Sequence, residues 1–272
     1  MSKISWTNKT WNPVVGCSKV SDGCKNCYAE RMAHRLSCMG QFKYDIVTSS
    51  RGKWNGSVNC DESALDKPMH WKNPRRIFVC SMGDLFHESV PFEFIDKVVK
   101  VLEACPHHTG QILTKRSERL LEYSEYRNYQ WPDNIIGMVT AENQPMADLR
   151  IPYLLQCGFR TTGVSVEPML GAVRLDFASP SRYEKRNFLT GDESNVCDLR
   201  GTNFGNKLDW VIIGCESGPG KRECKLEWVR NLVGQCKAAN EAVFVKQLNI
   251  DGKVVKKIEE FPTDLQIQEY PK

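Results

Sequence analysis

"RIFVCSMGDLF", residues 76–86, is a short apolar run that ends in small and polar residues. Its apolar part is rich in Val, Ile and Phe, the composition of a strand that is buried on both faces. Similar runs follow along the chain: "GQILTKR" (110–116), "NIIGMVTAEN" (134–143), "RTTGVSVEP" (160–168), "LDWVIIGCESG" (208–218) and "AVFVKQL" (242–248). These runs predict the strands of a sheet that is covered on both sides.

Helical patterns lie between the runs. In "PFEFIDKVVKVLEAC" (91–105), Phe94, Val98 and Leu102 fall on one face of a helix. "LEWVRNLVGQCKAAN" (226–240) repeats this pattern. Strands that alternate with helices predict a parallel sheet with right-handed crossovers.

A further strand is expected near "ISWTNKTW" (4–11), which brings the total to about seven β/α units. This number favours a parallel (β/α) barrel, full or partial and of the TIM type, over an open doubly wound sheet. We expect a single α/β domain over residues 1–272, with polar insertions at about 39–75 and 174–207. Each insertion is either a surface loop or a lid over the site.

Polar side chains follow every predicted strand. They are Ser81 and Asp84; Thr114, Lys115 and Arg116; Thr140, Glu142 and Asn143; Ser165 and Glu167; Glu216 and Ser217; and Lys246 and Gln247. Barrel enzymes carry their sites at the carboxyl ends of the strands, so these residues predict a polar cavity there.

The composition and the amino-terminal segment argue against a secreted or membrane-spanning protein. The amino-terminal segment "MSKISWTNKTW" has no apolar run of the signal-peptide kind, and no segment is long enough to span a membrane. The twelve cysteines then indicate a reducing cytoplasm. A formal net charge of +4 permits a nucleic-acid partner without requiring one.

Three cysteines, Cys17, Cys24 and Cys27, form a CxxxxxxCxxC cluster. They are a disulfide fragment, part of a zinc site, or a three-thiolate iron–sulfur site. A structural zinc site needs a fourth protein ligand, usually from a second CxxC or an HxxxH pair, and neither is evident. Three thiolates with an open fourth position fit an iron–sulfur cluster better. The remaining cysteines are scattered and are expected to be small apolar residues of the core.

A three-cysteine loop after the first strand of a β/α barrel resembles the radical S-adenosylmethionine superfamily, although CxxxCxxC is the commoner spacing there. "NPVVGCSKVSDGCKNCYAERMAHR" (12–35), "IFVCSMGDLFHESVP" (77–91), "QILTKRSERL" (111–120), "VIIGCESGPGKR" (211–222) and "FVKQL" (244–248) together resemble a phage and bacterial family of unknown function. The resemblance implies that Cys17, Cys24 and Cys27 hold a 4Fe–4S cluster. S-adenosylmethionine bound to this cluster would be cleaved to a 5′-deoxyadenosyl radical that abstracts a substrate hydrogen.

The resemblance also implies cofactor contacts. Asn26 and Tyr28 would lie against the adenine, and the segment Ser81, Met82 and Gly83 would bind the methionine amino group. Thr140, Glu142 and Ser165 end later strands, where ribose and carboxylate contacts are often found. An external one-electron reductant of the flavodoxin or ferredoxin type is implied as a partner.

The residues that contact the substrate are expected among the other polar residues at the strand ends. The residues expected to bind substrate are Asp84, His87, Lys115 and Arg116. The residues expected to be catalytic are Glu167, Glu216 and Lys246. The competing interpretation of these last three residues is an internal salt bridge.

The expected substrate is a nucleic-acid base or modified nucleotide, as in a remodelling or rearrangement of a hypermodified pyrimidine in phage DNA. The alternatives are an amino-acid or peptide substrate, or a non-catalytic iron–sulfur or zinc module. Basic stretches with aromatic residues at 66–77 and 180–186, including Trp71 and Tyr183, either contact DNA or are solvated loops.

Overall fold

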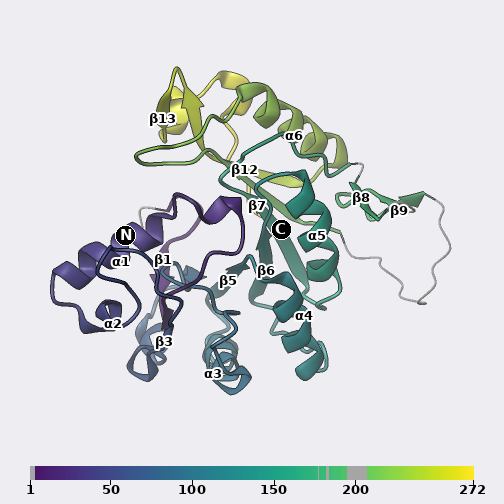
Figure 1. Ribbon diagram of the computed structural model, residues 1–272. Helices are drawn as coiled ribbons and strands as arrows, with labels where there is room; N and C mark the ends of the chain where they lie inside the picture. The colour runs from purple at the N-terminus through teal and green to yellow at the C-terminus, as the bar shows by residue number, and fades with distance from the viewer. Residues whose placement is uncertain (1–3, 177, 182–183, 195–206) are drawn as a thin grey trace. The chain divides into compact units, whose positions relative to one another are not determined.

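The computed structural model describes residues 4–176, 178–181, 184–194 and 207–272 (Figure 1). The chain divides into two compact units, Met1–Gly137 and Met138–Lys272. Among the described residues, no helix has both the length and the apolar character that a membrane crossing requires.

The first unit is built on short parallel strands. β1 (Lys9–Trp11) pairs with β4 (Arg76–Val79), and β4 pairs with β5 (Thr109–Thr114), each in parallel. β4 covers the first four residues of the run at 76–86, the apolar part that was expected to form the strand, and its Ile77, Phe78 and Val79 are buried. The polar residues that follow β4 and β5 lie at the carboxyl ends of these strands, as predicted.

The helices of the first unit are α1 (Tyr28–Cys38), α2 (Phe42–Asp45), α3 (Phe92–Glu103) and α4 (Ser117–Tyr126), with one-turn 3₁₀ helices at Asp22–Cys24, Glu62–Ala64 and Lys67–His70. α3 confirms the helix predicted at 91–105. Its buried side chains, Phe94, Ile95, Val98, Val99 and Leu102, recur at helical spacing and form one face.

Residues 39–75 are more than a loop. They contain α2 and β3 (Asn59–Cys60), which forms an antiparallel ribbon with β2 (Val14–Val15). The sparse apolar residues of this segment explain its packing, because Tyr44 and Val47 are buried in one cluster with Ala29 and Ala33 of α1. Figure 1 shows α1 and α2 side by side.

A buried carboxylate also attaches this segment to α1. Glu30 accepts a hydrogen bond from the Trp54 backbone N–H at 3.1 Å and pairs with Lys53 at 3.2 Å. Since the Glu30 side chain is only 2% exposed, these partners compensate its desolvation.

The second unit contains the parallel strands β7 (Thr161–Val166), β11 (Trp210–Gly214) and β12 (Ala242–Ile250), and β13 (Lys253–Val255) pairs with β12 in an antiparallel hairpin. All five residues of β11 are buried, as predicted for a strand covered on both faces. Its helices are α5 (Gln144–Leu155) and α6 (Leu226–Ala239), with 3₁₀ turns at Ile258–Glu260 and Thr263–Leu265.

The predicted insertion at 174–207 contains a small antiparallel sheet in the order β10-β9-β8, formed by β8 (Ala178–Ser181), β9 (Glu184–Arg186) and β10 (Glu193–Ser194). Tyr183 and Cys197 lie outside the described residues.

The main sheet has the hydrogen-bonded strand order β1-β4-β5-β6-β7-β11-β12-β13, with β6 at Ile135–Thr140. An α/β fold with a large, mostly parallel sheet is therefore confirmed. The described pairings do not include one that joins the first strand of this order to the last, so closure into a barrel stays a prediction.

Candidate functional site

The cysteine loop starts where β2 ends. Gly16 opens it with φ at +96°, and a Cβ atom at this position would lie 2.4 Å from the Ser57 carbonyl oxygen, so only glycine fits there. Cys24 ends a one-turn 3₁₀ helix, and Cys27 is the N-cap residue of α1. Cys17, Cys24 and Cys27 are all half-buried free thiols.

Hydrogen bonds attach both flanks of this loop to the segment that follows β4. The Gly16 N–H donates to the Met82 carbonyl at 3.0 Å, and the Tyr28 hydroxyl donates to the Ser81 carbonyl at 2.6 Å. Asn12 accepts from the Ser81 hydroxyl and from the Met82 N–H, both at 3.1 Å. The structure thus brings four of the residues expected to contact the cofactor, Ser81, Met82, Gly83 and Tyr28, to the cysteine loop; Asn26 lies within the loop.

A buried polar network lies beside Cys17, and its centre is Asp84. The Asp84 carboxylate accepts hydrogen bonds from the Thr114 hydroxyl at 2.7 Å and from the Phe86 N–H at 3.0 Å. It also pairs with the Arg116 guanidinium at 3.0 Å and accepts a weaker hydrogen bond from the Lys115 N–H at 3.4 Å. The ends of β4 and β5 are joined by this carboxylate.

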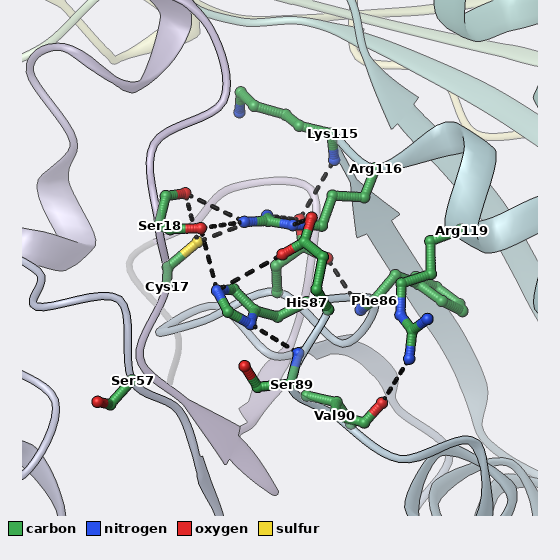
Figure 2. Close-up of polar contacts among 12 residues, drawn as sticks. Cys17, Ser18, Ser57, Phe86, His87, Ser89, Val90, Lys115, Arg116 and Arg119 are labelled. Atoms are coloured by element: carbon green, nitrogen blue, oxygen red, sulfur yellow. Dashed lines mark hydrogen bonds and ion pairs between the residues drawn. The ribbon is translucent and has the colours of Figure 1, made fainter.

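Arg116 extends the network to the cysteine loop (Figure 2). Its guanidinium donates to the Cys17 sulfur at 3.7 Å and to the carbonyl and hydroxyl oxygens of Ser18 at 3.2 and 2.8 Å. The side chain is 4% exposed. Arg116 was expected to bind substrate; the structure places its charge against a cysteine of the loop.

His87, also expected to bind substrate, completes the network. The Ser89 N–H donates to His87 Nδ1 at 3.2 Å, so Nε2 carries the ring hydrogen and donates to the Ser18 hydroxyl at 3.0 Å. Burial, and then the nearby Arg116 charge, lower the pKa of His87 and keep the ring neutral. With this tautomer His87 cannot take a proton from Ser18, so the pair is not a serine nucleophile with its base.

The Cys17 thiol carries its proton in the metal-free protein. Burial is the main cause, followed by the Asp84 charge, and together they raise the pKa of Cys17 to about 12 even though Arg116 acts in the opposite direction. The thiol donates to the Ser18 carbonyl at 3.3 Å. A metal that binds here must displace this proton.

Two observations test whether the loop fits a metal centre. Three free thiols within one short loop form the donor set that iron–sulfur clusters and zinc use. The Ser21 hydroxyl in the same loop is buried and has no hydrogen-bond partner among the described residues, which leaves it able to donate to a bound group. The donor set therefore fits, although the side chains of the described residues contain no group of three or more His, Cys, Asp or Glu already placed to hold a metal ion.

The second unit has its own polar groups at strand ends. The Lys246 ammonium lies 2.6 Å from Glu167 Oε1, and the Gln247 amide donates to the same oxygen at 3.3 Å. The Glu167 and Lys246 side chains are 17% and 19% exposed, so water or a ligand reaches both.

Glu216, the third predicted catalytic residue, is paired differently. Its carboxylate accepts three hydrogen bonds from Arg222: from the backbone N–H at 2.9 Å, from Nε at 3.0 Å and from Nη2 at 2.6 Å. The Glu216 side chain is 5% exposed. The predicted catalytic set thus separates into an accessible Glu167–Lys246 pair and a Glu216–Arg222 pair whose carboxylate is buried.

The residues expected to bind the ribose and carboxylate are deeply buried. Glu142 is fully buried and pairs with Arg150 at 2.8 Å, and Arg150 also donates to the Thr140 carbonyl at 2.8 Å. Ser165 is 2% exposed, and its carbonyl accepts from the Ala141 N–H at 2.9 Å.

Sequence reasoning missed Asn12, Arg150 and Arg222. Asn12 lies in the quoted cysteine stretch, five residues before Cys17, and its polar side chain there was an available signal. Arg150 and Arg222 lie outside the strand ends, and only a search for counter-charges to Glu142 and Glu216 would have found them.

The remaining thiols give a direct test of burial. Burial is the main cause that raises the pKa of Cys215 and Cys236 to about 12 and that of Cys224 to about 11, whereas Cys38 is exposed. We expect iodoacetamide at about pH 8 to modify Cys38 within minutes and to leave these three thiols unmodified until the protein unfolds, because the thiolate is the reactive form. Peptide mass spectrometry of the native protein measures this order, and early labelling of Cys215 would contradict it.

Comparisons with known proteins give one match. No curated protein and no solved structure matches the chain. A family model described as "Protein of unknown function (DUF5131)" matches residues 1–261, nearly the whole chain. The chain therefore belongs to the DUF5131 family.

Proposed function

We propose that the protein is a radical S-adenosylmethionine enzyme in which Cys17, Cys24 and Cys27 hold a 4Fe–4S cluster. The observation that carries the proposal is the construction of the cysteine loop. Three free thiols lie in a loop whose flanks are hydrogen-bonded to the end of β4, and a buried guanidinium donates to the first sulfur. A loop that only stapled the chain would not need this buried charge.

When bound, such a cluster supplies the electron that cleaves S-adenosylmethionine reductively. The residues of this chain would hold and shield it. Gly16 and Gly83 let two backbone segments approach closely, since a Cβ at Gly83 would lie 2.9 Å from the Gly16 carbonyl oxygen. The Ser81–Gly83 segment is held against the loop, where its backbone can bind the methionine part of the cofactor. An electron donor of the flavodoxin or ferredoxin type is part of the proposal.

Closure of the parallel sheet into a barrel is also part of the proposal. Parallel pairing of β1, β4 and β5, and of β7, β11 and β12, supports a full or partial TIM-type barrel. The twelve cysteines support a cytoplasmic location, where thiols stay reduced. The proposed substrate is a nucleic-acid base or modified nucleotide, supported by the resemblance to phage proteins; an amino acid or peptide is the alternative.

Anaerobic reconstitution with iron and sulfide tests the proposal. We expect a brown protein with about four iron atoms per chain, as one 4Fe–4S cluster requires. With dithionite it should cleave S-adenosylmethionine to 5′-deoxyadenosine and methionine, both measured by mass spectrometry. A protein that binds zinc, or that holds a cluster without cleaving the cofactor, would instead support a non-catalytic module.

The accessible Glu167–Lys246 pair gives a second prediction. We expect Lys246→Met to leave cofactor cleavage within about twofold of wild type and to abolish modification of the substrate, because Lys246 contacts substrate rather than the cofactor. Mass spectrometry of 5′-deoxyadenosine and of nucleosides from treated phage or host DNA separates the two effects. Lys253→Met, an exposed lysine on β13, is the matched control. If Lys246→Met modifies substrate normally, the substrate pocket lies elsewhere.

A further inference from the structure

The hydrogen-bonding capacity of Arg116 is completely used within the first unit. Nε donates to Glu88 at 2.9 Å, Nη1 to Asp84 at 3.0 Å and to the Cys17 sulfur at 3.7 Å, and Nη2 to two oxygens of Ser18. A guanidinium has five N–H donors in a rigid plane, and here each has an acceptor. Rotation toward another ligand would leave a buried donor unsatisfied, so Arg116 has a fixed position.

The support of this guanidinium is built into the strand ends. Its backbone N–H donates to the Thr114 hydroxyl at 2.9 Å, and the same hydroxyl donates to Asp84 at 2.7 Å. Asp84, in turn, is the buried counter-charge, 8% exposed. The charge next to Cys17 is therefore positioned before any ligand binds.

We propose that Arg116 is a positioning residue for the metal centre held by the cysteine loop: it fixes the Cys17 sulfur by a charge-assisted hydrogen bond and raises the reduction potential of the centre. This inference rests on the proposed function and deepens it. Hydrogen bonds to ligand sulfurs and nearby charges set the potentials of iron–sulfur centres, and partners of metal ligands commonly change metal affinity 10–100-fold.

The sign of the effect on the potential follows from the charges. One-electron reduction adds a negative charge to the centre, and a fixed positive charge nearby stabilises the reduced state. Replacement of Arg116 by methionine removes that charge and also leaves the Asp84 carboxylate without its counter-ion. Both changes disfavour the reduced state, so the potential must fall.

Two measurements on the whole chain test the inference. Cobalt(II) titration of the reduced, metal-free protein, followed by the thiolate-to-cobalt absorbance, should show Arg116→Met binding about 10–100-fold more weakly than wild type. In redox titration of the reconstituted protein, the ratio of reduced to oxidised centre at one fixed potential should fall about tenfold, which for a one-electron couple is 59 mV. Neither readout depends on enzyme activity.

Three variants separate positioning from folding. Arg116→Lys keeps the charge without the planar fork, so its potential should stay near that of wild type while its cobalt affinity falls. Arg119→Met is the matched control: Arg119 lies one turn further along α4 and donates to the Val90 carbonyl at 2.8 Å, and none of its described contacts is to the cysteine loop. If Arg116→Met unfolds, the double variant Asp84→Asn/Arg116→Met keeps the buried site neutral and takes its place in the cobalt titration, where it should still bind about 10–100-fold more weakly than wild type.

The outcomes distinguish the inference from the proposed function. If Arg116→Met binds cobalt as tightly as wild type and has the same potential, or if the double variant that replaces it binds cobalt as tightly as wild type, Arg116 is only structural and the inference is wrong, while the metal site stands. If wild type binds neither cobalt nor a cluster, the proposed function is wrong and this inference falls with it.

Discussion

Replacement of Cys24 by alanine is expected to abolish the cluster and all cofactor cleavage, and Cys17→Ala and Cys27→Ala should do the same. With only three thiolates in the loop, each iron–thiolate bond is needed to hold the cluster. Cys24 lies half-buried in a short 3₁₀ turn, so its loss should change the free energy of unfolding by only about 0.5 kcal/mol. The reconstituted variants should therefore be folded, colourless and inactive.

Iron and sulfide analysis, visible absorbance and thermal unfolding measure these outcomes together. Cys38→Ala is the matched control, because Cys38 is an exposed thiol at the end of α1, close in sequence to the loop. It should reconstitute like wild type. Full S-adenosylmethionine cleavage by Cys24→Ala would show that the three cysteines do not act as a set, and about eight iron atoms per wild-type chain would reveal a second cluster.

The parts of the fold that the sequence predicts are those with a strong local pattern. The sequence predicts β11 as a strand because all its residues are apolar. It predicts α3 as a helix because Phe94, Val98 and Leu102 recur at helical spacing. The segment 39–75 lacks both patterns. Its structure depends on a few long-range contacts, such as those of Tyr44 and Val47 with α1 and of Trp54 with Glu30, which no local pattern encodes.

The candidate site shows the same division. The position of Asp84, Glu142 and Glu167 at strand ends follows from the alternation of strands and helices, and the sequence suffices to predict it. The partner of each group depends on tertiary packing. Sequence reasoning therefore placed Arg116 among substrate ligands and grouped Glu216 with Lys246, whereas the structure pairs Arg116 with Asp84 and Glu216 with Arg222.

Loss of the Glu142–Arg150 pair is expected to have the largest effect on stability. Arg150→Met leaves the fully buried Glu142 carboxylate without its counter-charge, and such a loss destabilises a protein by about 3–5 kcal/mol. Urea unfolding followed by circular dichroism measures the change. Arg230→Met is the matched control, because Arg230 forms an exposed pair with Asp264, and exposed ion pairs contribute little to stability.

The double variant Glu142→Met/Arg150→Met decides whether Glu142 only forms a structural ion pair or also contacts the cofactor. Apolar residues of similar volume often replace a buried ion pair without loss, so the double variant should regain most of the stability lost in Arg150→Met. If the pair is only structural, the double variant regains stability and also keeps its S-adenosylmethionine cleavage activity. If Glu142 contacts the cofactor ribose, as the family resemblance implies, the double variant is stable but its affinity for S-adenosylmethionine falls at least about tenfold, the loss of one hydrogen bond to a charged group. Since Glu142 is fully buried and already bound by Arg150, we expect the first result.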